Sequence, residues 1–117
     1  MINTSLIYNN KSLKLINRKI QPSKDDVVVK VRSCGICGSD IKILRGKNKR
    51  VKIGRVIGHE ISGQICNIVS KKPVTSNQNI IFGADIPSKT KKDFALGHEI
   101  DGGFQQYMII KKKLLNK

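Results

Sequence analysis

The 117 residues of this chain suit one small domain, and its 38% share of hydrophobic residues can form a modest core. Only 4% of the residues are aromatic and Trp is absent, so the composition disfavours a protein that stacks single-stranded bases on aromatic side chains. The net charge of +15 comes mostly from scattered lysines, which predicts non-specific polyanion binding at low salt and no specific nucleic acid partner.

The start of the chain offers no export or membrane signal. The stretch MINTSLIYNNKSLKL has no uninterrupted apolar segment, and no run approaches the roughly 18 apolar residues that cross a bilayer. Three cysteines, an odd number, favour reduced thiols when no export signal is present. The sequence therefore predicts a cytoplasmic protein with no membrane partner.

The first third of the chain is typical of strands. Residues 6–8 and 13–16 are predicted strands around a tight turn at Asn9 and Asn10, because adjacent Asn residues tolerate positive φ. Residues 27–31, VVVKV, are apolar on both faces at their start. A strand of that kind is predicted to lie in the middle of a sheet.

A short helix is predicted directly after the cysteines. Ser39 or Asp40 is a candidate N-cap, Ile41 and Leu44 share one helical face, and Gly46 is a natural end. The next segments are predicted to be a basic loop (47–55), a strand (56–69), a turn region (71–79) and a second strand (80–84). A polar connector (86–94), a third strand (103–110) and a basic tail (111–117) complete the chain as predicted from its sequence. Several short strands with glycine at the turns predict a mainly β protein, a small, partly open barrel or a sandwich.

The stretch CGICGSD raises the question of what its two thiols do. A zinc ribbon needs a second Cys or His pair, but the one later cysteine, Cys66, stands alone in a predicted strand and reads as a small buried residue. A redox CxxC should open a long helix in a βαβ unit, and this chain offers a short helix and no parallel crossover. Both interpretations are weak.

A mixed site is the remaining interpretation. Cys37, His59 and Glu60 offer a thiolate, an imidazole and a carboxylate, a ligand set that suits Zn²⁺. Adjacent strand residues point to opposite faces, so His59 and Glu60 face one metal only at a bend, which Gly58 permits. A second GHE at residues 97–99 is not taken as a repeat. Its His98 and Glu99 are predicted non-ligands, because they precede a turn and lack a nearby thiol.

Three segments together resemble a known family. VVVKVRSCGICGSD, GRVIGHEISGQI and DGGFQQYMII are similar, in order and spacing, to the N-terminal half of the zinc-dependent medium-chain dehydrogenases, the alcohol, polyol and threonine dehydrogenase group. The resemblance covers nearly the whole chain. It implies one GroES-like domain over residues 1–117, with a partly open β-barrel fold.

The resemblance also implies a ligand set for one catalytic zinc. Cys37 corresponds to the zinc thiolate and His59 to the imidazole ligand of the family. Glu60 corresponds to the neighbouring glutamate, which either binds zinc or lies just behind it. Zinc in this family polarises an alcohol or polyol substrate, and a hydride passes from the substrate to NAD(P).

Two further positions take their roles from the same resemblance. Ser39 stands where the family has a hydroxyl that relays the substrate proton, and Asp40 where it has a carboxylate that orients the zinc histidine. Cys34 has no ligand role in the family and is expected to pack. Lys42 departs from the pattern, because many relatives have a histidine of the relay at that position.

Two larger features of the family are missing from this sequence. No GxGxxG follows a strand, so NAD(P) is expected to bind only through a missing nucleotide-binding domain. The segment after FGADIP contains no cysteine, so the structural-zinc lobe is expected to be absent. The isolated chain is therefore expected to be an incomplete enzyme, and neither its substrate nor its choice of NAD or NADP can be read.

Two hypotheses follow for the chain by itself. It is either the zinc-binding portion of a dehydrogenase, or a truncated, non-enzymatic barrel that binds metal or polyanions. The first requires a separate nucleotide-binding domain as partner. In either case an apolar wall left uncovered predicts a homo-oligomer or aggregation.

Overall fold

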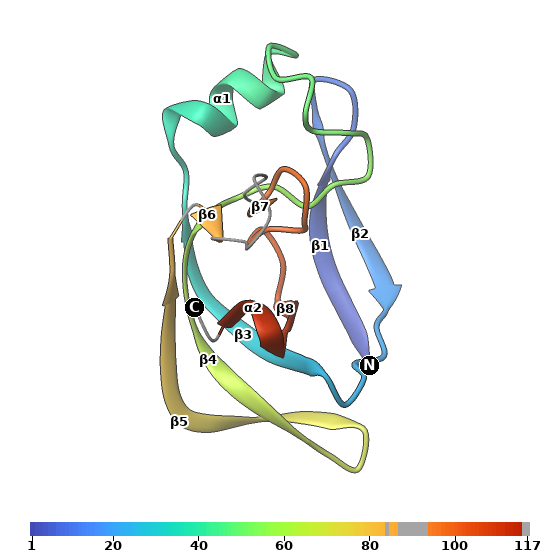
Figure 1. Cartoon of the computed structure of the whole chain (residues 1–117). Helices are drawn as coiled ribbons and strands as arrows, with labels where there is room; N and C mark the ends of the chain where they lie inside the picture. The colour runs from blue at the N-terminus through green and yellow to red at the C-terminus, as the bar shows by residue number, and fades with distance from the viewer. Residues whose placement is uncertain (84, 87–93, 116–117) are drawn as a thin grey trace.

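The structure, a computed structural model, describes residues 1–83, 85–86 and 94–115. In chain order the elements are β1 (Ile2–Tyr8), β2 (Leu13–Lys19), β3 (Asp26–Gly35), α1 (Gly38–Leu44), β4 (Glu60–Val69), β5 (Lys72–Phe82), β6 (Asp85–Ile86), β7 (Phe94–Ala95), β8 (Tyr107–Lys111) and α2 (Lys112–Leu115). Figure 1 shows α1 at one end of the molecule and the β1–β2 hairpin along one side. Among the described residues, neither helix is long and apolar enough to cross a membrane.

The main sheet has four antiparallel strands in the order β5-β4-β3-β8. The predicted central strand is confirmed, because β3 pairs with β4 on one side and with β8 on the other. Val28 and Val29 are both buried although they point to opposite faces, so the sheet is covered on both faces there. β3 is longer than predicted and continues to Gly35, which places Cys34 in the strand.

The β1–β2 hairpin forms a sheet of its own and confirms the predicted pair of strands. Its turn lies one residue later than predicted. The Asn9 N–H donates to the Ser12 carbonyl at 2.8 Å, and the left-handed residues are Asn10 and Lys11, with φ of 50° and 64°. The central pair of such a turn needs positive φ at both positions, which explains the shift. An isolated bridge from Ser5 to Gln105 connects the hairpin to the rest of the molecule.

The predicted turn region over residues 71–79 is wrong for residues 72–79, which belong to β5, whereas the strand predicted over residues 80–84 is confirmed up to Phe82 as the second part of β5. The hairpin turn lies at Ser70 and Lys71, with φ of 50° and 63°. The polar sequence of β5 suggested a loop, but β5 is an edge strand with mostly exposed side chains. An edge strand also accepts a proline, here Pro73, because one row of its backbone groups has no strand partner.

Helix α1 confirms the predicted helix but not its N-cap. The N-cap is Cys37, whose N–H donates to the Asp40 carboxylate at 2.9 Å, so Asp40 serves from the third helical position. The buried apolar residue of α1 is Ile43, whereas Ile41 is 40% exposed, so the predicted apolar face was misplaced. Gly46 ends the helix as predicted, with φ of 72°.

Two clusters of buried side chains make up the core. The first lies against the main sheet and the second lies under α1 and the hairpin; they contain Val29, Ile61, Phe82, Leu96, Met108 and Ile110, and Tyr8, Ile43, Val51 and Ile57. Ile57 belongs to one cluster and Ile61 to the other, so residues 58–60 run from one core to the other. The backbone of residues 58–60 is therefore fixed by packing in both clusters, which positions the side chains on it.

The sheets do not close on one another, which confirms the mainly β, partly open architecture. Cys66 is buried, as predicted for a small packing residue. The predicted basic tail contains the short helix α2, whose Leu114 and Leu115 pack against the first cluster. In the predicted polar connector β6 pairs with β7, and residues 87–93 lie outside the described residues.

Candidate metal centre

The chain bends sharply just before His59, as Gly58 predicts. Gly58 has φ of 97°, a conformation that L side chains rarely adopt. A Cβ on Gly58 would lie 2.7 Å from the Cys34 sulfur and 2.7 Å from Phe104 Cδ1. Both the backbone conformation and the packing therefore require glycine at this position, and the bend turns His59 toward the start of α1.

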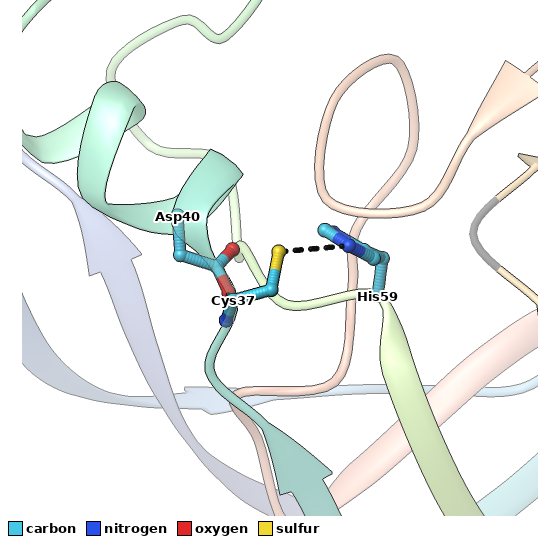
Figure 2. A group of neighbouring side chains, drawn as sticks. All are labelled: Cys37, Asp40 and His59. Carbon is cyan, nitrogen blue, oxygen red and sulfur yellow. Dashed lines mark hydrogen bonds between the residues drawn. The ribbon is translucent and has the colours of Figure 1, made fainter.

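Cys37 and His59 come from separate segments and meet at this bend. The Cys37 Sγ lies 3.2 Å from the His59 Nε2, and Figure 2 shows the two side chains pointing toward each other. The Ser39 hydroxyl oxygen lies 2.8 Å from the same sulfur. His59 is 9% exposed, so the pair is largely shielded from water but can still be reached.

Asp40 supplies a buried carboxylate next to this pair. One oxygen, Oδ2, accepts the Cys37 N–H, and the other, Oδ1, is buried without a hydrogen-bond partner among the described residues. Ligand atoms of Cys37, Asp40 and His59 all lie within 4.8 Å of one another. A buried carboxylate oxygen without a partner is costly, so its presence here points to a cation.

The geometry of these groups fits a zinc ion. With a Zn–S bond of about 2.3 Å and a Zn–N bond of about 2.0–2.1 Å, sulfur and nitrogen on one tetrahedral zinc lie about 3.5 Å apart. The 3.2 Å between Cys37 Sγ and His59 Nε2 is close to that separation. Thiolate and imidazole are also the ligand types that zinc prefers over the harder divalent ions.

Glu60 lies apart from this group. It starts β4, pairs with Gly35 of β3, and has an exposed side chain. Its carboxylate lies over Gly35, where an added Cβ would be 2.5 Å from Glu60 Oε2. Among the described residues, the group of side chains that could hold a metal ion consists of Cys37, Asp40 and His59, and Glu60 is outside it.

Cys34 behaves as a packing residue, as predicted. It is partly buried against the first cluster, and its sulfur fills the space beside Gly58 and Gly103. Burial, with a smaller effect of the Asp40 charge, raises the pKa of the Cys34 thiol to about 11.

His98 lies close to the site, which sequence reasoning did not anticipate. Its ring centroid is 6.3 Å from that of His59. The two GHE glycines are in contact, since a Cβ on Gly97 would lie 2.9 Å from the Gly58 nitrogen. The repeated tripeptide was the available signal, but the spacing along the chain gave no indication of this contact.

Glu99, the other member of the second GHE, points away from the metal-binding cluster. Its carboxylate forms an ion pair with Arg50 and accepts the Ala95 N–H at 3.1 Å. The contact holds the turn that follows β7 against the basic loop. This role agrees with the prediction that Glu99 is not a ligand.

An open groove adjoins the metal-binding cluster. It has a volume of about 410 Å³ and is lined by Ser33, His59, Glu60, Ile61, Ser62, Ile81, Phe82 and Gly83. His59 lies at its wall, so one side of the imidazole faces a space that a small molecule can enter. Ile81 and Phe82 of the edge strand β5 line part of the groove.

Comparison with known proteins gives one consistent family. Residues 23–117 match the family described as Alcohol dehydrogenase GroES-like domain. The starvation-sensing protein RspB of Escherichia coli K12 is 36% identical over 92% of this chain, and the L-threonine 3-dehydrogenase of Bacillus licheniformis is 33% identical over 73%. The chain spans 36% and 29% of the lengths of those two proteins.

Solved structures agree with this family. The short chain alcohol dehydrogenase rspB of E. coli CFT073, complexed with NADH, superposes with a TM-score of 0.73 at 32% identity, over 96% of this chain and 36% of that one. An alcohol dehydrogenase of Thermotoga maritima gives a TM-score of 0.79 over 96% of this chain and 39% of that one. At 15% identity the latter supports the fold alone.

Proposed function

The chain belongs to the alcohol dehydrogenase GroES-like domain family, and from this premise we propose that it is the zinc-binding catalytic portion of an NAD(P)-dependent alcohol or polyol oxidoreductase. The observation that carries the proposal is the 3.2 Å approach of Cys37 Sγ to His59 Nε2, beside the partnerless oxygen of Asp40. Cys37 and His59 hold the zinc in this proposal. Glu60 is the neighbouring carboxylate, which reaches the metal only if its side chain swings away from Gly35.

A bound zinc would supply Lewis-acid polarisation of the substrate hydroxyl. Ser39 has its hydroxyl 2.8 Å from the Cys37 sulfur, so it can accept and pass on a proton at the edge of the site. Asp40 accepts the Cys37 N–H with one oxygen, and its carboxylate lies beside the Cys37–His59 pair, where its charge favours a cation. In this proposal the same carboxylate orients the His59 ring. The groove beside His59 gives a small alcohol its path to the metal.

Residues 1–117 form a single GroES-like domain in this proposal, and NAD(P) binds through a nucleotide-binding domain outside these residues. The chain spans 36% of the length of RspB, which supports a nucleotide-binding domain outside these residues. The rspB structure is described as complexed with NADH, which favours a nicotinamide cofactor here. No cysteine follows Cys66, so we propose no structural zinc, and we place the protein in the cytoplasm.

A non-enzymatic barrel that binds polyanions is the second candidate, favoured by the net charge of +15. It predicts that binding to heparin survives at physiological salt, with a steep dependence on salt concentration. A heparin column run at several salt concentrations measures this, and loss of binding at physiological salt would count against the polyanion candidate.

The decisive test of the zinc proposal is the metal content of matched cysteine variants. We expect about one zinc per chain in the wild type, little in Cys37→Ser, and wild-type content in Cys66→Ala, which removes a buried thiol far from the cluster. Circular dichroism checks that each variant is folded. Unchanged zinc in a folded Cys37→Ser variant would overturn the assignment, and turnover by the chain alone would overturn the need for a separate nucleotide-binding domain.

A further inference from the structure

A tight turn in the segment between α1 and β4 brings two cationic residues together. The Arg55 N–H donates to the Lys52 carbonyl at 3.1 Å, and Gly54 between them has φ of 96°. A four-residue turn closed in this way holds its first and last residues close to each other, so Lys52 and Arg55 are neighbours. Tyr8 fixes the turn to the β1–β2 hairpin through backbone hydrogen bonds of 2.8 and 2.9 Å, and Figure 1 shows this green segment beside the hairpin.

A third cation reaches the same place from β2. Arg18 donates through Nη2 to Asp101 Oδ2 at 2.9 Å, and Arg55 donates through Nη1 to Asp101 Oδ1 at 3.0 Å. The Val56 N–H also donates to Oδ1, at 3.1 Å. Both oxygens of Asp101 are therefore engaged, and this carboxylate holds the two guanidinium groups close to each other.

The contacts with Asp101 leave part of the hydrogen-bonding capacity of both arginines unused. The Nε atoms of Arg18 and Arg55 are buried without a hydrogen-bond partner in the described part of the chain, which is costly. The Nε–H and one Nη2–H of a guanidinium are parallel and form a fork that matches two oxygens of a phosphate. Arg55 reaches Asp101 through Nη1, and its side chain is 30% exposed, so a small rotation can present this fork to a ligand.

An open pocket adjoins these cations. It has a volume of about 290 Å³ and is lined by Arg18, Lys52, Ile53, Gly54, Arg55 and Asp101. Three cations and one carboxylate give the pocket a local excess of two positive charges. Ligand sites commonly have volumes of about 300–1,000 Å³, so this pocket suits one small anionic group rather than a whole cofactor.

We propose that the pocket formed by Arg18, Lys52 and Arg55 binds a phosphate dianion, either inorganic phosphate or the phosphoryl group of a small phosphate monoester. A dianion balances the local excess of two positive charges, whereas a carboxylate would balance half of it. Its oxygens also accept the arginine N–H groups that Asp101 leaves unused. None of these residues belongs to the Cys37–His59 pair or lines the groove beside it, so the inference does not rest on the proposed function.

Calorimetric titration of the full chain with inorganic phosphate at physiological ionic strength tests the proposal, because salt suppresses the general attraction of a positive surface. Lys52→Gln should weaken phosphate binding about threefold, and Arg18→Lys, which keeps the charge but loses the fork, about tenfold. Lys72→Gln removes one charge from an exposed position of β5 and should keep the wild-type affinity. Both site variants retain the Arg55–Asp101 ion pair, and circular dichroism checks that they are folded.

A second titration with ribose 5-phosphate separates the two sources of the dianion. Binding at least as tight as that of inorganic phosphate assigns the pocket to a phosphate monoester, and weaker binding assigns it to the free ion; either result upholds the site. The proposal is overturned if the heat of phosphate binding does not saturate, or if Lys52→Gln and Arg18→Lys bind phosphate as tightly as Lys72→Gln does. Zinc content should be the same in all three variants, so failure here would leave the zinc proposal standing.

Discussion

At the scale of single residues, the site depends on Gly58, where the absence of a side chain lets neighbouring backbone segments approach each other. Gly58 adopts φ of 97° and leaves no room for a Cβ between Cys34 and Phe104. That one position turns His59 toward Cys37 and admits the loop that carries His98. The ligands themselves are common residue types, and the glycine makes their convergence specific.

Replacing Gly58 tests this dependence. Gly58→Ala should lower the free energy of unfolding by about 1–3 kcal/mol through backbone strain, with a further cost from the contact with Cys34, and should weaken zinc binding. Gly38→Ala is the matched control, since a Cβ there meets nothing within 4 Å and the residue is helical. Urea unfolding monitored by circular dichroism compares the two variants. Equal stability of Gly58→Ala and Gly38→Ala would contradict the role given to the bend.

The raised pKa of Cys34 makes a second prediction at this scale. Alkylation of Cys34 at neutral pH should be slow, and its rate should keep rising up to about pH 11, because burial holds the thiol protonated. The folded pKa exceeds the ordinary value of 9.0, so the contribution of this thiol to stability holds below pH 9 and is lost toward pH 11. Mass spectrometry of timed labelling reactions follows the site. A rate that levels off near pH 9 would show that burial does not shift this thiol.

At the scale of elements, one buried amide connects β1 of the hairpin directly to β8 of the main sheet. Asn3 is 1% exposed; its Nδ2 donates to the Gln105 side chain and to the Tyr107 carbonyl, each at 2.9 Å, and its Oδ1 accepts the Tyr107 N–H. Removing Asn3 leaves buried backbone groups of β8 without partners. At this end of β1 the hairpin is therefore held by polar contacts, whereas its other end packs through Tyr8 in the second cluster.

Asn3→Ala should lower the free energy of unfolding by about 2–4 kcal/mol, because several buried hydrogen bonds are lost together. Asn17→Ala removes the exposed contact to Thr4 in the same hairpin and should change stability by no more than about 0.5 kcal/mol. Thermal unfolding of both variants measures the difference. If both variants melt together, the hairpin is not held by Asn3.

The elements also show what the sequence could and could not predict. Strands with strong apolar patterns, such as β3, were predicted, and so were the bend at Gly58 and the identity of Cys37 and His59 as candidate ligands. The first part of β5, residues 72–79, was missed because an edge strand carries polar side chains that resemble a loop, whereas its apolar end at residues 80–82 was predicted. The N-cap was misplaced because Cys37 takes that position through the Asp40 carboxylate. His98 was set aside because its closeness to His59 depends on a contact between glycines 39 positions apart in the sequence.

At the scale of the whole molecule, several large apolar side chains remain exposed. On β5, an edge of the main sheet, Ile81 is 83% exposed and Val74 is 49% exposed. An edge strand with unpaired backbone groups and apolar side chains favours association with another chain. The expected homo-oligomer, or docking of a nucleotide-binding domain, would cover such a surface.

Light scattering of Ile81→Lys tests this expectation. The wild type should associate at high concentration, and the added charge at the edge of β5 should reduce the apparent mass toward that of a single chain. Leu15→Lys, at a 66% exposed position of the hairpin, is the control that adds the same charge elsewhere. A wild type that stays a single chain at all concentrations would contradict the prediction.

The central claim is that Cys37 and His59, brought together at the Gly58 bend, hold a zinc ion through one thiolate. X-ray absorption at the zinc edge of the metal-loaded chain tests it most directly. We predict one sulfur at about 2.3 Å with the remaining ligands being nitrogen or oxygen at about 2.0–2.2 Å, and loss of the sulfur contribution in Cys37→Ser. A zinc shell with no sulfur in the wild type, or the same sulfur signal in both proteins, would contradict the account.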